Sequence, residues 1–232
     1  MAEGQQAVAS DIFSIVVVGA MNPRIHQPQW YRMIGAIDES ELQAAQNTQM
    51  VISQAISQFR FSSDPVIAIV CAAEQWNIQS NSDAVWDRML KIASITFSKL
   101  SETPISAYAF NVQKHFKTDL DSVKDELAEA ISGMGLGFPV GKSIGSIIHT
   151  DLIEDDYKIH VSVQPSLNGE SSVFIAYNSE YQAPAAPSGG YFDLGRLMSG
   201  RFAVHQEKSK KVMGDVVASI NKRVRQKQLK QE

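Results

Sequence analysis

Apolar residues along the chain fall into short runs, and the spacing within each run predicts which runs are strands. Residues 12–20 predict a first strand, because Ile15–Val18 is a continuous apolar run rich in β-branched residues. Residues 48–61 and 65–76 predict two more strands. Within the second of these, Val66–Val70 shows no polar alternation, which is typical of a central strand buried on both faces.

Polar and proline-containing stretches separate these strands and predict where the chain turns. Pro23 and Pro28 exclude regular structure from residues 22–30, since proline lacks a backbone N–H and restricts the residue before it. Asp38 and Glu41 have the spacing of a capping box, in which each side chain accepts a hydrogen bond from the other residue's backbone N–H. They predict a short helix that begins at Asp38.

The middle and the end of the chain show the 3.6-residue period of amphipathic helices. Such helices are predicted over residues 83–100, 119–132 and 205–227, each with one apolar face. Residues 182–200 are rich in Pro, Gly, Ala and Ser and predict a long loop, with at most one helical turn near Leu194–Met198. Further strands are predicted over residues 105–113, 143–153, 157–165 and 171–178.

The predicted order of elements is βββαβ followed by αβββα, which indicates an α+β fold with mainly antiparallel strands. In residues 157–165 apolar and polar residues alternate, so one face of that strand is expected to meet water. A diverged duplication is an alternative description, with halves at 12–113 and 118–204. The expected organisation is a flexible N-terminus (1–11), a single α+β domain (12–204) and a basic C-terminal helix (205–232).

Composition narrows the class of protein. The chain has 232 residues, of which 44% are hydrophobic and 20% are charged, as in ordinary globular proteins. Its one cysteine, Cys71, excludes an intrachain disulfide and lies in an apolar run, where we expect it to be buried. The polar start of the chain and the lack of an apolar run of roughly 18 residues predict a cytoplasmic protein that does not cross a membrane.

Charge is distributed unevenly. Residues 208–232 carry a local charge of +6, whereas residues 1–207 carry −10. A basic helix on an acidic body indicates a surface for docking onto a protein or onto nucleic acid, or a solvated helix end. The residues that form this basic tail are Lys208, Lys210, Lys211, Lys222, Arg223, Arg225 and Lys227.

The proline-bracketed loop near the N-terminus is a second candidate for partner binding. It combines Arg24, His26, Trp30, Tyr31 and Arg32, and Trp, Tyr and Arg contribute most of the energy at protein interfaces. The alternative is that Trp30 and Tyr31 simply cover the edge of the core. Both interpretations remain open on the sequence alone.

No motif of a cofactor, a metal site or an enzyme is recognisable. The run 133–143 ends in Gly141-Lys142-Ser143 like a phosphate-binding loop, but Leu136 occupies the position of the required glycine. The run also follows a predicted helix instead of preceding one, so we interpret it as a connecting loop. Neither a metal nor a cofactor is predicted, since no short His–His spacing occurs among the five histidines His26, His115, His149, His160 and His205.

Several short motifs occur in a fixed order along the chain. They are Asn22–Ile25 with Pro28 and Trp30, Thr103–Ala107 with Asn111, Val161–Ser166, and Val173–Ile175 with Asn178 and Tyr181. Together they resemble a family of uncharacterised bacterial proteins of about this length, found sporadically across genomes. The resemblance covers most of residues 12–220 and implies no known activity or catalytic residues. The sporadic distribution of that family favours a role in conflict between bacteria and phages.

Three functions are compatible with these observations. The first is a non-enzymatic binding or assembly subunit of a cytoplasmic bacterial complex, with a protein partner or a second copy of the chain. The second is an accessory protein that contacts nucleic acid through its basic helix. The third is a ligand-binding or enzymatic domain whose site is assembled from scattered residues, which predicts a pocket with converging titratable groups.

Overall fold

One antiparallel sheet organises the protein. The computed structural model describes residues 10–133, 148–154, 157–184 and 193–228. Within these residues, nine strands pair in the order β2-β3-β4-β5-β1-β6-β9-β8-β7, which confirms the predicted α+β class and antiparallel sheet. The strands are β1 (Ile12–Gly19), β2 (Val51–Ile52), β3 (Ile56–Ser63), β4 (Val66–Ala72), β5 (Gln75–Ser80), β6 (Ile105–Lys117), β7 (Ile148–Glu154), β8 (Tyr157–Pro165) and β9 (Ser172–Gln182).

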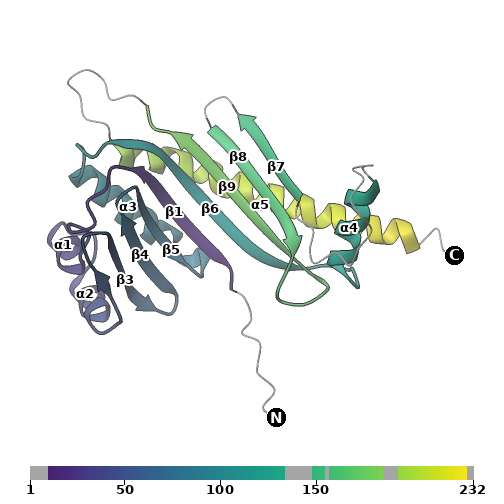
Figure 1. The fold of residues 1–232 in the computed structure, drawn as a ribbon, viewed down its shortest axis with the longest axis horizontal. Helices are drawn as coiled ribbons and strands as arrows, with labels where there is room; N and C mark the ends of the chain where they lie inside the picture. Colours follow the sequence, from purple (N-terminus) through teal and green to yellow (C-terminus); the bar gives the residue numbers. More distant parts are fainter. Residues whose placement is uncertain (1–9, 134–147, 155–156, 185–192, 229–232) are drawn as a thin grey trace, which may run out of the picture.

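Helices cover one face of this sheet, and the longest of them, α5, crosses behind it (Figure 1). Tyr31 packs against Phe59 of β3 with 5.5 Å between ring centroids, and Trp86 packs against Phe202 of α5 at 5.1 Å. The core therefore lies in one layer between the sheet and the helices. The helical elements are α1 (Pro28–Met33), α2 (Glu39–Gln46), the 3-10 turn η1 (Asp83–Val85), α3 (Trp86–Lys99), α4 (Val123–Gly133) and α5 (Leu194–Gln228).

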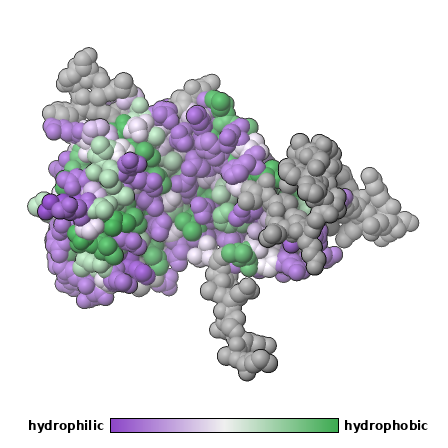
Figure 2. Space-filling model, in the orientation of Figure 1, coloured by the Kyte–Doolittle hydropathy of each residue, from purple (hydrophilic) through white to green (hydrophobic). Residues whose placement is uncertain are grey.

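Alternation along the strands decides which residues reach the core. In β8 the side chains of Tyr157, Ile159, Val161 and Val163 are buried under the helices, and the residues between them lie on the other face, as the pattern predicts. No helix covers that second face in Figure 1, and Figure 2 shows hydrophilic residues spread over it with hydrophobic residues between them. We call it the uncovered face.

The order of elements repeats once along the chain. The first half runs β1, α1, α2, β3, β4, β5 and α3, with the short β2 before β3. The second half runs β6, α4, β7, β8, β9 and α5. β1 and β6 pair with each other at the centre of the sheet, and the strands of each half follow outward in the same order. The repeat thus begins at β6, whereas the predicted halves assign this strand to the first half.

Local signals explain the elements that the sequence located well. In α2, Asp38 Oδ1 accepts from the Glu41 backbone N–H at 2.9 Å and Glu41 Oε2 accepts from the Asp38 N–H at 2.9 Å, so the predicted capping box is confirmed. Ser82 accepts from the Ala84 N–H at 3.2 Å and starts the predicted helix of residues 83–100 as η1 and α3. Cys71 is buried, as expected.

The predicted order of elements is wrong in the first third of the chain. Residues 22–30 were expected to be irregular, yet α1 begins at Pro28, because proline suits the first turn of a helix, where its missing N–H costs no hydrogen bond. Residues 65–76 were expected to form one strand but contain the turn between β4 and β5. β4 is also not buried on both faces, since only every second residue is buried under the helices.

The last helix is longer than predicted. α5 begins at Leu194 instead of residue 205, so the helical turn expected near Leu194–Met198 is the first part of a continuous helix. Leu194, Met198 and Phe202 are buried along it, and this packing outweighs the low helix propensity of the glycines in the segment. No helix in the described part of the chain combines the length and the apolar character needed to cross a membrane.

Candidate functional site

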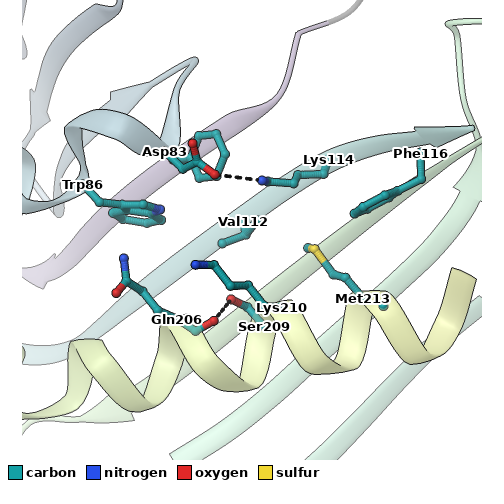
Figure 3. Close-up of a pocket in the computed structure, with 11 residues that line it drawn as sticks. Asp83, Trp86, Val112, Lys114, Phe116, Gln206, Ser209, Lys210 and Met213 are labelled. Carbon is teal, nitrogen blue, oxygen red and sulfur yellow. Dashed lines mark hydrogen bonds and ion pairs between the residues drawn. The ribbon is translucent and has the colours of Figure 1, made fainter.

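A pocket of about 230 Å³ lies between the sheet and α5. Strands β1 and β6 form its floor, η1 and the start of α3 close one side, and α5 passes over it (Figure 3). We call it the α5 pocket. It is lined by Phe13, Asp83, Trp86, Val112, Lys114, Phe116, Gln206, Ser209, Lys210, Met213 and Gly214.

The period of two along β6 brings one charged side chain into this pocket. Tyr108, Phe110 and Val112 point toward the helices and are buried, and Lys114 and Phe116 follow at the same spacing. A lysine therefore continues an otherwise apolar row on the covered face of the sheet. Lys114 reaches the pocket because this row of side chains along β6 extends past the fully buried part of the core.

Spacing along α5 supplies the opposite wall. The pocket-lining residues of α5 are spaced so that they share one face of the helix. Gln206 and Lys210 are four residues apart, and Met213 and Gly214 follow Lys210 by three and four residues. Met213 is buried, whereas Gln206 and Lys210 extend from α5 toward β6 (Figure 3). Ser209 is buried beside them, and its hydroxyl donates to the Gln206 carbonyl at 3.1 Å.

Aromatic rings form the apolar part of the pocket. Phe13 and Trp86 are both buried and meet edge to face, with 5.6 Å between their centroids. Phe116 lies at the other end (Figure 3). Little of Phe13 or Trp86 is accessible, so the half-buried Phe116 offers the more accessible ring to a ligand.

The polar groups of the pocket are mostly hydrogen-bond donors. Lys114 Nζ lies 3.1 Å from Asp83 Oδ2 and 4.9 Å from the centre of the Phe13 ring. Within the described part of the chain, the side chains of Lys210 and Gln206 have no hydrogen-bond or ion-pair partner, and neither has the indole N–H of Trp86. With two ammonium groups and one carboxylate, the pocket carries one net positive charge.

The hydroxyl and the carboxylate of the pocket are both engaged in contacts within the protein. The one carboxylate of the pocket, Asp83, already pairs with Lys114. The Ser209 hydroxyl donates to a backbone carbonyl, and among the described residues no histidine or carboxylate contacts it as a general base would. Among the same residues, no cluster of three His, Cys, Asp or Glu side chains is close enough to hold a metal ion.

The predicted docking loop is only partly on the surface. His26 and Tyr31 are 1% and 0% exposed, which corrects their expected place on a binding surface. The Tyr31 hydroxyl accepts a hydrogen bond from Trp76 Nε1 at 2.7 Å and lies 2.7 Å from His26 Nδ1. Burial lowers the pKa of His26 to about 4. The burial of Tyr31 agrees with the alternative prediction that it covers the edge of the core, whereas the burial of His26, in the loop before α1, was not predicted.

The other three residues of that loop remain accessible. Arg24 and Arg32 are exposed, and Arg32 pairs with Glu39 at 3.2 Å. Trp30 is half-buried and lines a shallow groove together with the exposed Met33. Partner binding by this loop stays a prediction.

The residues of the basic tail differ in their contacts. Lys208 donates to the Tyr157 hydroxyl and lies 3.1 Å from Glu154 Oε1, and the hydrogen bond to Tyr157 raises the pKa of Lys208. Lys210, Lys211 and Lys222 are exposed, and Lys210 also lines the α5 pocket. The side chains of Arg223, Arg225 and Lys227 lie outside the described residues, as does most of the glycine-rich run 133–143, whose Gly133 ends α4.

A row of polar residues crosses the uncovered face. Ser14, Asn111, Asn178, His160 and Asp151 lie side by side on five neighbouring strands. The Asn178 amide donates to Asn111 Oδ1, the Asn111 amide donates to Ser14 Oγ at 3.1 Å, and His160 Nδ1 lies 2.7 Å from Asp151 Oδ1. The row gives this face a polar, nearly neutral character.

Of the residues that build the α5 pocket, the sequence analysis singled out only Lys210. Phe13, Trp86 and Lys114 come from three separate elements, and their meeting depends on the pairing of β1 with β6. One usable signal was present, which is a lysine at an inward position of an apolar strand. No protein-family model and no curated protein matches this chain, so the resemblance to a bacterial family stays a prediction.

Proposed function

We propose that this chain is a non-enzymatic binding protein that holds a small ligand in the α5 pocket. The observation that carries the proposal is the convergence of unpartnered donors, Lys210, Gln206 and the Trp86 indole N–H, on a space walled by aromatic rings. Binding pockets commonly combine apolar walls with a few polar groups that orient the ligand. The volume of about 230 Å³ is below the usual range of drug-sized pockets, so the ligand is small.

A pocket-filling variant tests this proposal. Gly214 lines the pocket, and a Cβ atom placed on it meets no other atom within 4 Å, so Gly214→Leu fills open space without disturbing the core. Gly200 is an equally unobstructed glycine of α5 that does not line the pocket, so Gly200→Leu is the matched control. Both changes also raise helix propensity.

The experiment screens a panel of single-ring compounds by ligand-observed NMR against the three proteins. We expect compounds that bind the wild type and Gly200→Leu and are blocked by Gly214→Leu. If every compound that binds is indifferent to Gly214→Leu, the α5 pocket is not the ligand site.

A second candidate function is the docking of a protein partner on the uncovered face, as in an assembly subunit of a cytoplasmic bacterial complex. The polar row centred on Asn111 and Asn178 supports it, because such a face suits the wet, hydrogen-bonded interfaces of transient complexes. Nucleic-acid binding through the basic helix is a weaker proposal, since Lys208 already pairs with Glu154.

Co-purification from the native host tests the docking proposal. Ser162 lies on the uncovered face, and Ser162→Arg should remove a stoichiometric protein partner that survives a salt wash and nuclease treatment. Gln43→Arg adds the same charge to an exposed position of α2 and should keep the partner. Recovery of nucleic acid alone, lost with salt, would instead support binding through the basic helix.

A further inference from the structure

The α5 pocket contains more hydrogen-bond donors than acceptors. Lys114 is matched by Asp83 at 3.1 Å, but Lys210 has no counter-charge among the described residues. The Trp86 indole N–H adds one further donor, and the Gln206 side-chain amide adds N–H donors together with one acceptor oxygen (Figure 3). A donor-rich site of net positive charge is complementary to a ligand that brings acceptors and negative charge.

The shape of the pocket constrains the rest of the ligand. Phe13 and Trp86 form a rigid aromatic corner, but they are only 2% and 4% exposed, so the half-buried Phe116 offers more accessible ring surface. Met213 is an apolar contact from α5. A flat ring fits such a corner by edge-to-face or offset packing, and methionine adapts to its edge. About 230 Å³ leaves room for one ring with a small substituent.

We infer that the α5 pocket binds a small aromatic anion, of the aryl carboxylate or aryl phosphate class. The ring packs against Phe116 and the accessible parts of Phe13 and Trp86, and the anionic group accepts from Lys210 at the mouth of the pocket. Lys114 pairs with Asp83. It adds positive charge to the pocket but is not the main contact of the anionic group. The inference rests on the proposed function and adds the class of ligand to it.

Four probes separate the parts of this inference. Benzoate and phenyl phosphate carry both the ring and the charge, benzamide carries the ring alone, and inorganic phosphate carries the charge alone. Binding to the full-length protein is followed in ¹H–¹⁵N spectra, in which the indole N–H signal of Trp86 reports directly on the pocket. Trp76 is an internal reference, because its indole N–H is bonded to Tyr31 in the core.

We expect at least one of the two aromatic anions to bind about tenfold tighter than benzamide and inorganic phosphate, with a shift of the Trp86 signal. Lys210→Gln should weaken that anion about tenfold, as for loss of a charge-assisted hydrogen bond, and should leave benzamide unchanged. Lys211→Gln, which changes the neighbouring exposed lysine outside the pocket, should leave the anion affinity unchanged. The stronger of the two anions then distinguishes carboxylate from phosphate.

Other outcomes overturn the inference in identifiable ways. If benzamide binds as tightly as both aromatic anions, charge has no role, and if inorganic phosphate binds as tightly as both, the ring has no role. Both outcomes overturn the ligand class and leave the proposed function intact. If none of the four probes binds, the ligand class is wrong. The proposed function fails as well only if the wider panel contains no compound that Gly214→Leu blocks.

Discussion

His205 should make the protein sensitive to acid. It is 1% exposed on α5, and its ring lies 5.2 Å from the ring of Phe110 and 5.6 Å from that of Tyr177. Nδ1 lies 3.0 Å from the Ser179 hydroxyl, and Nε2 has no partner in the described part of the chain. Burial lowers the pKa of His205 to about 3, from an ordinary value of 6.5.

The direction of the effect follows from this pKa. Between pH 6.5 and pH 3 the unfolded chain binds a proton at His205 and the folded protein does not, so acid favours unfolding. The stabilisation is complete above pH 6.5 and is lost as the pH falls. Because one pH unit corresponds to about 1.4 kcal/mol per proton, His205 removes about 3 kcal/mol of unfolding free energy between pH 7 and pH 4.

Urea unfolding at pH 7, 6, 5 and 4 measures this contribution in the wild type and in His205→Gln. The variant should be less stable at pH 7, and its disadvantage should shrink by about 3 kcal/mol at pH 4. His149→Gln removes an exposed histidine and is the control. Parallel pH dependences of the wild type and His205→Gln would refute the account, because they would mean that His205 takes up its proton in the folded protein.

Two substitutions and one labelling experiment test the packing. Gly19→Ala places a Cβ 2.2 Å from the Pro104 carbonyl oxygen and should cost about 3 kcal/mol or more in denaturant unfolding; a stable variant would contradict this close approach. Tyr31→Phe removes the acceptor of the Trp76 indole N–H and should cost about 1–3 kcal/mol, whereas an unchanged unfolding midpoint would make the bond dispensable. Cys71 is buried, and burial raises the pKa of its thiol to about 12. An aromatic disulfide reagent should therefore label Cys71 only as fast as the protein unfolds. Rapid labelling of the native protein would disprove the burial of Cys71.

Elements that depend on neighbouring residues were predictable from the sequence. The alternation of Tyr157, Ile159, Val161 and Val163 identified β8 and its buried face, because burial on one side of a strand imposes a period of two. The capping box at Asp38 identified α2 for a similar reason, since its partners are three residues apart.

Elements that depend on distant contacts were not predictable. Nothing at Ala73 and Glu74 has the Gly, Pro or Asn content that marks a tight turn, so β4 and β5 read as one strand. The first turns of α5 contain Gly195 and Gly200 and become helical because the chain packs there against α3. Gly195 permits this approach, as a Cβ on it would lie 2.9 Å from the Ser94 carbonyl oxygen.

The candidate site shared this limitation. A pocket whose walls come from β1, β6, η1 and α5 has no signature in any one segment. Only the lysine at position 114, out of place in an inward-facing row, could have pointed to it. Its carboxylate partner Asp83 comes from a separate element, η1, and the two meet only once β6 and η1 are in place.

The central pairing of β1 with β6 has a consequence for how the protein is made. When the first half leaves the ribosome, β1 can pair with β5, but its other edge has no strand to join until residue 117 has emerged. The apolar side of the second half waits longer, for α5 at Leu194–Gln228, which follows every strand along the chain. A nascent chain thus exposes the apolar side of its second half to self-association until α5 has emerged, and chains that end before Leu194 are expected to aggregate.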